Sequence, residues 1–286
     1  SLVLADGPAG LRLASCYFTQ KGQPLIPPLE QCFENGFLAR GEYNPGGTRH
    51  YQYCTAFPIG TMLAQSWNTC LLQEVGAAVG YEMALFGVSL WLAPGMNIHR
   101  SPLCGRNFEY FSEDPLLSGQ MAAAITRGVQ SCPGCGVTLK HFACNNQETE
   151  RLESNSLVSE RALREIYLRG FQIAVQSAQP SAIMTSYNLV NGVHAANSAA
   201  LCTAIARCEW GFAGIFMTDW DTTSSRRCTA EGCIQAGNDL LMPGSRREYS
   251  ALLCALRDGR LDRRLLRSCA GRIIKTALGL SAPTAP

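Results

Sequence analysis

Charged residues, long apolar runs and phosphate-binding motifs are all scarce in this sequence, and each scarcity excludes a class of function. Charged residues make up 16% of the chain, with a net charge of +2 and no basic block, so nucleic acid is not an expected partner. No apolar stretch approaches the roughly 18 residues of a transmembrane helix, so no membrane partner is expected. Neither a GxGxxG nor a P-loop pattern is present, which argues against a nucleotide-binding protein. The 47% hydrophobic content excludes a disordered chain.

Cysteine, by contrast, is abundant, with fourteen irregularly spaced residues. A small disulfide scaffold would be shorter and richer in loops, so we expect free thiols and, from them, a cytoplasmic location. Cys132 and Cys135 form a CxxC, but no second CxxC or histidine pair accompanies it to complete a zinc site. A loop before a strand is the favoured interpretation, and neither a metal nor an organic cofactor is expected.

Six short apolar runs each end at a polar cluster. The run at 214–217 leads into Thr218, Asp219 and Trp220; the others are 2–5, 88–93, 137–139, 182–184 and 240–241. Buried parallel strands that deliver polar groups at their C-terminal ends are typical of a β/α barrel and its active-site face. We therefore predict an α/β protein of the (β/α)8 TIM-like barrel type.

The gaps between these runs carry apolar residues at helical spacing. Helices are predicted at 60–86, 115–131, 159–178, 198–208, 224–236, 246–258 and 261–277. Residues 1–280 are expected to form one barrel domain and 281–286 a tail or linker. Because six strands fall short of eight and the chain enters a strand directly at its start, we expect a barrel incomplete at its N-terminus within a longer polypeptide.

Residues 16–56 are a long polar insertion between the first strand and the first helix. A loop at this place in a barrel lies on the catalytic face, where it typically forms a lid or a subsite wall. Inert decoration is the alternative, and the sequence does not choose between them.

Sugars are neutral, hydroxyl-rich ligands that proteins hold with charged hydrogen-bonding groups. Such groups occur at the expected strand ends: Asp6, Arg12, Arg106, Lys140, His141, Arg151, Tyr187 and Asp219. Their sequence contexts make the match specific. The motifs are LADGPAGLR (4–12), LAPGMNI (92–98), GRNFEYFSEDP (105–115), KHFA (140–143), MTSYN (184–188) and MTDW (217–220). Together they resemble the barrel domain of glycoside hydrolase family 3, β-glucosidase type.

The resemblance implies a role for the residues at both ends of this series. Asp219 would be the catalytic nucleophile, forming a covalent glycosyl-enzyme that water later releases with retained configuration. Asp6, beside Arg12, would take two hydroxyls of the sugar at its non-reducing end. Trp220 would offer an apolar wall to a sugar face or pack into the core, and these two alternatives stay open.

The remaining residues would complete the sugar pocket by the same resemblance. Arg106 would reach the pocket, with a glutamate of its own loop pairing with it or orienting its neighbours. Lys140 and His141 would donate to adjacent hydroxyls, and the cation would help to keep the nucleophile ionised. Arg151 resembles a further subsite arginine, while Tyr187 would hydrogen-bond the nucleophile or fill the barrel mouth.

A retaining glycosidase also needs a second carboxyl group, about 5–5.5 Å from the nucleophile, to protonate the leaving group. In the β-glucosidase type of this family that group comes from a second domain. The stretch YQYCTAFP (51–58) resembles the subgroup in which an α/β sandwich domain precedes the barrel. Glu148, Glu150 and Glu231 are available carboxylates, but nothing in the sequence seats one of them opposite Asp219.

These features predict a retaining glycoside hydrolase that acts on terminal β-D-glucosyl or related β-glycosyl residues of a glucoside or oligosaccharide. An α/β sandwich domain of the full-length protein would complete the site. The alternatives are a β-xylosidase or α-L-arabinofuranosidase of the same family, or a catalytically incomplete sugar-binding fragment.

Overall fold

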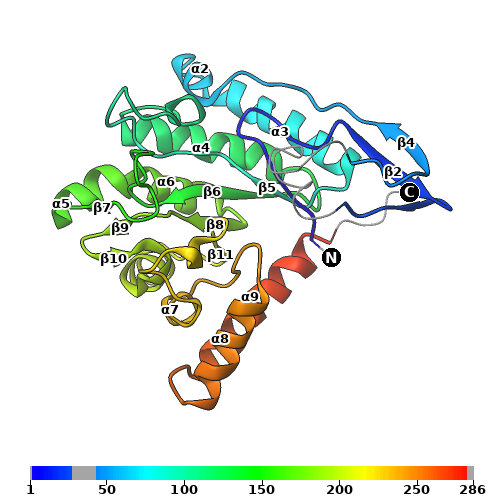
Figure 1. Ribbon diagram of the computed structural model, residues 1–286. Coiled ribbons are helices and arrows are strands. Elements are labelled where there is room, and N and C mark those ends of the chain that lie inside the picture. Colours follow the sequence, from blue (N-terminus) through cyan, green and yellow to red (C-terminus); the bar gives the residue numbers. More distant parts are fainter. Residues whose placement is uncertain (1, 28–42, 282–286) are drawn as a thin grey trace.

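A parallel β-sheet forms the centre of the protein. The computed structural model describes residues 2–27 and 43–281. Five strands lie in the order β1 (Leu4–Asp6), β5 (Leu90–Leu92), β6 (Gly136–Phe142), β8 (Ala182–Thr185) and β11 (Ile215–Thr218). Every neighbouring pair is parallel, and Leu240 continues the sheet through a parallel bridge to Met217. Five of the six predicted strands are therefore present, the run at 240–241 contributes only this bridge, and the parallel α/β fold is confirmed (Figure 1). Within the described residues the sheet does not close on itself.

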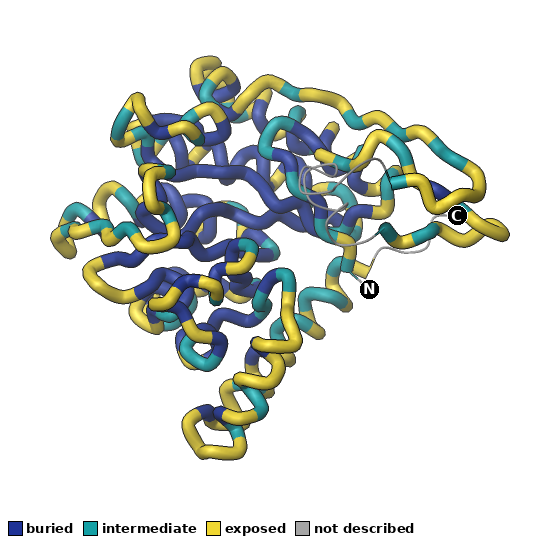
Figure 2. The backbone as a smooth tube through the Cα atoms, viewed as in Figure 1, coloured by how far each residue is buried: buried dark blue, intermediate teal, exposed yellow. Residues whose placement is uncertain are grey.

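Helices cover the sheet, so its strands are buried on both faces (Figure 2). β5, β6, β8 and β11 are buried along their whole length, with Trp91 and Phe216 fully enclosed. The helices α3 (Thr69–Phe86) and α4 (Pro115–Gln130) pack side by side, and α4 lies against β6. This burial explains why the strands read as continuous apolar runs rather than as alternating patterns.

The helix predicted over 60–86 is two helices, which corrects that prediction. α2 (Gly60–Gln65) ends before Asn68, whose side chain accepts a hydrogen bond from Leu71 N and so begins α3. An N-cap residue has non-helical backbone angles, so it separates two helices even where the apolar spacing continues.

The remaining helices fall close to their predicted ranges. They are α5 (Glu160–Ala162), the π-helix η2 (Leu163–Tyr167), α6 (Arg169–Ala178), the π-helix η4 (Ala200–Glu209), α7 (Ala230–Ala236), α8 (Arg246–Arg257) and α9 (Arg263–Gly279). The prediction over 224–236 was too long at its start: Thr229 caps α7, and the short turn η5 (Thr222–Ser224) lies before it. None of the described helices is both long and apolar enough to cross a membrane.

The insertion at 16–56 is not a structureless loop. Its described residues form a three-stranded antiparallel sheet of β2 (Cys16–Gln20), β3 (Gln23–Pro24) and β4 (Thr48–Tyr51), with Phe18 buried beneath it. Residues 28–42 of the insertion lie outside the described residues. A second small sheet that the sequence did not predict joins β7 (Asn155–Ser156), β9 (Leu189–Val190) and β10 (Val193–His194).

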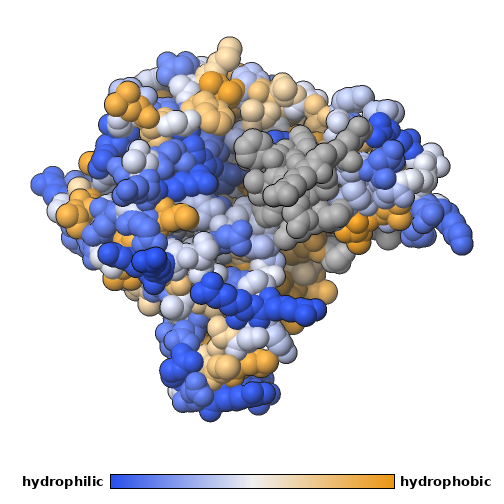
Figure 3. Space-filling model, in the orientation of Figure 1, coloured by the Kyte–Doolittle hydropathy of each residue, from blue (hydrophilic) through white to orange (hydrophobic). Residues whose placement is uncertain are grey.

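The surface is largely polar on the face seen in Figure 3, with hydrophobic side chains gathered toward the top of the molecule, near α2. All thirteen cysteines within the described residues are free, in line with the prediction of free thiols; Cys32 lies outside those residues.

Candidate active site

A tight turn after β1 places two charged side chains together. Gly7 has φ +131°, and a Cβ there would lie 1.9 Å from the carbonyl oxygen of Gly10, so only glycine fits this turn. The turn returns the chain to β1, where Arg12 N donates to the Asp6 carbonyl oxygen at 2.8 Å. The Arg12 guanidinium consequently forms an ion pair with the Asp6 carboxylate.

Lys140 reaches the same carboxylate from β6. Its Nζ lies 2.7 Å from Asp6 Oδ1, and its side chain is only 4% exposed. Burial alone would raise the pKa of Asp6, but Lys140 and Arg12 outweigh it and lower that pKa to about 2. Asp6 is therefore a carboxylate at any physiological pH.

His141 follows Lys140 directly, yet both side chains reach the same end of the sheet. Consecutive residues of a regular strand point to opposite faces. Here the pairing of β6 with β8 shifts register between Leu139 and Phe142, so the alternation is interrupted. Asn97 holds the backbone at this point: its side chain donates to His141 O and accepts from His141 N, both at 2.8 Å.

Arg106 and Tyr110 fix the His141 ring. Arg106 Nη2 lies 3.0 Å from His141 Nε2, and Tyr110 Oη lies 3.3 Å from His141 Nδ1. Because a guanidinium can only donate, Nε2 accepts and the ring proton resides on Nδ1. Burial lowers the pKa of His141 well below 6.5, and Arg106 and Lys140 lower it further, so the ring is neutral.

Asp219 lies at the end of β11, where the sequence placed it. Its side chain is 8% exposed, Oδ1 accepts from Trp220 N at 2.8 Å, and Oδ2 lies 3.6 Å from His141 Nε2. Burial raises the pKa of Asp219 above its ordinary 3.8, although Arg106 and Lys140 oppose this. The result is a buried carboxylate that faces cations but is bonded directly to neither.

Tyr187 and Arg151 close the other side of the cluster. Tyr187 Oη donates to Trp220 O at 2.7 Å, and its hydroxyl also interacts with the Asp219 carboxylate. Burial raises the pKa of Tyr187, and the negative charge of Asp219 raises it further. The Arg151 guanidinium lies 4.9 Å from the centre of the Tyr187 ring and pairs with Glu148 at 2.9 Å.

Trp220 packs against the core. Its half-buried side chain lies against a cluster formed by strand residues that include Leu92, Met184 and Met217. These contacts agree with the core-packing alternative, and the role of Trp220 as a wall for a sugar face stays a prediction.

The nine candidate residues thus form one connected group at the C-terminal ends of the strands. The sequence also anticipated a glutamate beside Arg106: it is Glu109, which is buried and paired with that guanidinium. Tyr110 and Asn97 were not predicted as part of the site. Asn97 stood in a polar cluster after a strand, and that position was a signal for its role.

Of the three carboxylates that the sequence left unassigned, two are bonded to arginines and the third, Glu150, is exposed. Glu148 is bonded to Arg151, and Glu231 is bonded to Arg260. Among the described residues, the charged groups that act most strongly on Asp219 are Arg106 and Lys140. No second carboxylate is among those groups.

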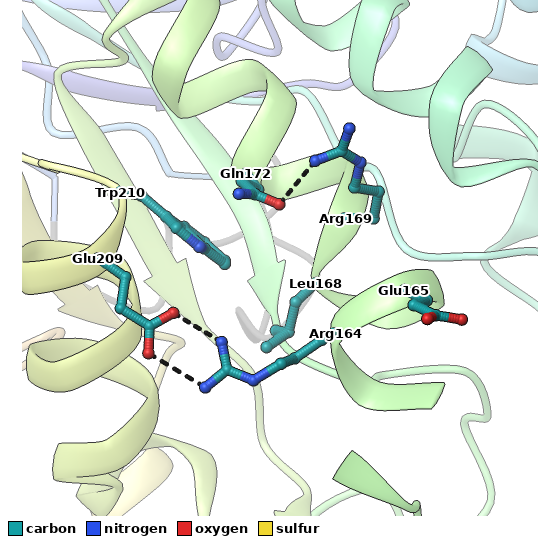
Figure 4. A pocket seen from close by; sticks show the side chains of 7 residues that line it. All are labelled: Arg164, Glu165, Leu168, Arg169, Gln172, Glu209 and Trp210. Carbon is teal, nitrogen blue, oxygen red and sulfur yellow. Dashed lines mark hydrogen bonds and ion pairs between the residues drawn. The ribbon is translucent and has the colours of Figure 1, made fainter. Parts of the chain in front are cut away.

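A cavity of about 400 Å³ lies away from this cluster (Figure 4). It is lined by residues of η2, α6 and the end of η4, where Arg164 Nη1 pairs with Glu209 at 2.6 Å and Arg169 bonds to Gln172. None of the candidate site residues lines it, and its fourth charged residue, Glu165, pairs with Arg161 outside the lining.

Comparisons with known proteins agree with this arrangement. A family model described as the glycosyl hydrolase family 3 N terminal domain matches residues 40–276. A β-glucosidase of Ruminococcus albus is 44% identical over 248 residues, covering 83% of this chain and 26% of that protein. An exo-α-(1→6)-L-arabinopyranosidase of Bifidobacterium longum is 48% identical over 205 residues, covering 72% of this chain and 26% of that protein. The chain therefore spans about a quarter of the length of these curated relatives.

Solved structures also resemble the chain. β-Glucosidase 3B from Thermotoga neapolitana in complex with α-D-glucose has a TM-score of 0.82 and 43% identity, over 97% of this chain and 35% of that one. The family 3 β-glucosidase of Bifidobacterium adolescentis has a TM-score of 0.79 and 38% identity, over 98% of this chain and 36% of that one.

Proposed function

Since the chain belongs to glycosyl hydrolase family 3, we propose that it carries the nucleophile and sugar pocket of a retaining β-glycosidase acting on terminal β-D-glucosyl residues. The observation that carries this proposal is the Asp219 carboxylate. It is buried at the strand ends, accepts one backbone hydrogen bond and has cations near it, so it has lone pairs available for reaction. The names of the relatives and the glucose in a solved neighbour favour glucose as the sugar.

In the proposed reaction an Asp219 oxygen attacks the anomeric carbon and displaces the aglycone, giving a glycosyl-enzyme. Water then hydrolyses this ester with retained configuration. Arg106 and Lys140 favour the ionised form of Asp219, which opposes the effect of its burial. The neutral His141 adds no positive charge beside it.

The sugar would be held mainly by Asp6 and Lys140. Asp6 stays ionised, and a carboxylate with about four lone-pair positions can accept two hydroxyl protons while it keeps Arg12 and Lys140 as partners. Lys140 has three N–H donors, so one bonded to Asp6 leaves others for a hydroxyl.

The group that protonates the leaving group would come from a part of the protein outside this chain. Glu109 and Glu148, which lie near the cluster, are bonded to arginines, and the chain spans about a quarter of its relatives. We propose that an α/β sandwich domain supplies the acid/base. Full turnover of unactivated glucosides by residues 1–286 alone would refute this part of the proposal.

A second specificity has support from one observation. Some relatives are named exo-α-(1→6)-L-arabinopyranosidases. β-Xylosidase and α-L-arabinofuranosidase activities of the same family are further candidates. A panel of 4-nitrophenyl glycosides, tested on the full-length protein, separates these specificities.

The test of the mechanism uses a 2-fluoro-β-glucoside with a dinitrophenyl leaving group. Such a group departs without acid assistance, so the missing acid does not prevent labelling. We expect a stable glycosyl adduct on the peptide that contains Asp219, detected by mass spectrometry. Asp219→Asn should abolish the adduct, and Asp221→Asn is the matched control because that aspartate is exposed and two residues away.

An adduct on a different carboxylate would overturn the assignment of Asp219. No adduct on a chain shown to be folded would overturn the proposal that these residues alone hold the glucose pocket. The same experiment with the corresponding 2-fluoro-xyloside then tells whether another sugar is preferred.

A further inference from the structure

Two cysteines meet in the segment that follows Asp219. Cys228 Sγ and Cys233 Sγ are 3.6 Å apart, and their residues are 4% and 0% exposed. Cys228 ends the loop that starts at Asp219, and Cys233 lies in the first turns of α7, beyond the N-cap Thr229. The two sulfurs are in contact without a bond, so only a small movement separates them from the 2.03–2.05 Å or so of a disulfide.

A histidine stands beside this pair. His194 Nδ1 accepts a hydrogen bond from Ala196 N at 3.2 Å, so the proton of the neutral ring is on Nε2. That Nε2 is buried and has no hydrogen-bond partner among the described residues. The Cys233 thiol and His194 both lower the pKa of Cys228 below its ordinary value, although burial opposes them, whereas the pKa of Cys233 is raised by its bond to Cys228 and by burial. Cys228 is consequently the thiol that ionises first.

The CxxC of the sequence provides a contrast. Cys132 Sγ is directed at Ala77 O and Cys135 Sγ at Gly80 O, so neither thiol is bonded to the other. Burial raises the pKa of Cys135 to about 11, which keeps it a thiol. Cys132 and Cys135 thus lack a hydrogen bond between their thiols. Cys228 and Cys233, which are five positions apart, have their sulfur atoms in contact.

We propose that Cys228 and Cys233 are a redox-active dithiol that a small peroxide converts to a disulfide, tying the loop after Asp219 to α7. Nothing in this proposal depends on the glycosidase function. It rests on the contact of two buried sulfurs and on His194, which interacts with Cys228 and whose buried Nε2 has no other hydrogen-bond partner among the described residues.

The reaction balances with one hydrogen peroxide per pair. The Cys228 thiolate attacks a peroxide oxygen, the O–O bond breaks, and hydroxide leaves with the proton that the thiol had lost, giving water and a sulfenic acid. Cys233 Sγ then attacks the Cys228 sulfur, the S–O bond breaks, and a second water leaves with the Cys233 proton. Two thiols are oxidised by two electrons, and one peroxide is reduced to two waters.

The bond would affect a segment that is connected to the proposed nucleophile. Thr222 Oγ1 donates to Asp219 O at 2.8 Å, Thr223 Oγ1 donates to Glu248 at 2.6 Å, and Ser225 Oγ donates to Glu153 at 3.1 Å, so these loop side chains are held by non-covalent bonds. A disulfide at its end would add a covalent restraint. The oxidised protein should therefore show slower amide exchange over 221–229 than the reduced protein.

The chain is well suited to a direct test by peptide mapping. Trypsin releases residues 228–246, which contain Cys228 and Cys233 as their only cysteines, and residues 128–140, which contain Cys132 and Cys135 as theirs. The folded protein is treated with a slight excess of hydrogen peroxide, denatured, alkylated with iodoacetamide and digested.

We expect the 228–246 peptide to lose both alkylation sites and to weigh less by two hydrogen atoms than its reduced form. Dithiothreitol added before alkylation should restore both sites, and the 128–140 peptide should be alkylated twice throughout. Double alkylation of 228–246 after peroxide, or oxidation of 128–140 first, would overturn the proposal.

Single variants test which of the two sulfurs attacks the peroxide. In Cys233→Ser the sulfenic acid on Cys228 should persist and be trapped by dimedone, whereas Cys228→Ser should leave Cys233 unmodified. His194→Gln should slow the loss of thiol at Cys228. A dimedone adduct on Cys233 in Cys228→Ser would contradict the role of Cys228 as the attacking thiol, and the wild-type map still decides if a variant fails to fold.

Discussion

Two buried aspartates lie near opposite ends of β11 and differ in how their oxygens are used. Asp239 is fully enclosed: Oδ2 accepts from Arg207 Nη2 at 2.7 Å and from Phe216 N at 2.8 Å, and Oδ1 accepts from Arg272 Nε at 2.7 Å. Asp219 accepts one backbone hydrogen bond, from Trp220 N, and its Oδ2 lies 3.6 Å from His141 Nε2.

The difference separates a carboxylate that supports the fold from one that is available for chemistry. Asp239 has its charge compensated by two arginines that in turn donate to neighbouring groups, including Gly214 O. Asp219 is buried without such compensation, which raises its pKa. Active sites commonly hold ionisable groups whose pKa values are shifted by burial. The raised pKa of Asp219 fits the catalytic role proposed for it.

The largest expected effect comes from replacing each aspartate by asparagine. Asp239→Asn leaves two half-buried arginines undercompensated and should lower the free energy of unfolding by about 3–5 kcal/mol. Asp219→Asn removes a poorly compensated buried charge and should leave that free energy unchanged or higher. Urea denaturation followed by circular dichroism measures both. Equal losses of unfolding free energy in the two variants would contradict the proposed difference between Asp239 and Asp219.

The next effect concerns the two cations on Asp6. Lys140 is buried and Arg12 is 42% exposed. Lys140→Met should lower the free energy of unfolding by about 1–3 kcal/mol, because it leaves a charged group without a buried partner. Arg12→Gln removes a pair that water already screens and should cost below about 1 kcal/mol. If Arg12→Gln lost more unfolding free energy than Lys140→Met in the same urea titration, the expected order of the two cations would be wrong.

The dependence of stability on pH should have opposite signs for Asp6 and Asp219. The pKa of Asp6 is lowered to about 2, so its contribution is present above its unfolded value near 3.8 and is lost as pH falls toward 2. The pKa of Asp219 is raised, so between 3.8 and that raised value the native state binds the extra proton, and stability falls as pH rises.

Two variants separate the contributions of Asp6 and Asp219 to the pH dependence of stability. The stability of Asp219→Asn relative to the wild type should increase as pH rises above about 3.8, and that of Asp6→Asn should decrease over the acid range above about 2. The rate of labelling by the 2-fluoro-glucoside should fall as acid protonates Asp219, at a pH above that expected for an ordinary aspartate. A midpoint at or below 3.8 would contradict the raised pKa.

The smallest effect is expected at Tyr187. Tyr187→Phe removes the 2.7 Å hydrogen bond to Trp220 O but keeps a ring beneath Arg151, so the free energy of unfolding should fall by about 0.5–1.5 kcal/mol. Thermal and urea unfolding measure this. A labelling rate that falls much more than stability would show that the hydroxyl also acts on Asp219.

Some features of the fold could be predicted only in part. The strands were found because each is a continuous apolar run ending in polar residues, and the helices because their apolar spacing is regular. The break at Asn68 was missed because a side-chain cap interrupts a helix without disturbing that spacing. The sheet of β2, β3 and β4 was missed because its strands are short and mostly exposed.

The sequence by itself determined that this is a parallel α/β protein of glycosyl hydrolase family 3 and which side chains stand at its strand ends, since strand burial and local motifs are written in consecutive residues. Only the tertiary structure decided how those side chains are used. The proton on His141 Nδ1, the open carboxylate of Asp219, the closed one of Asp239 and the meeting of Cys228 with Cys233 all depend on groups far apart along the chain or on the path of a loop. Their positions follow from packing, which no local pattern encodes.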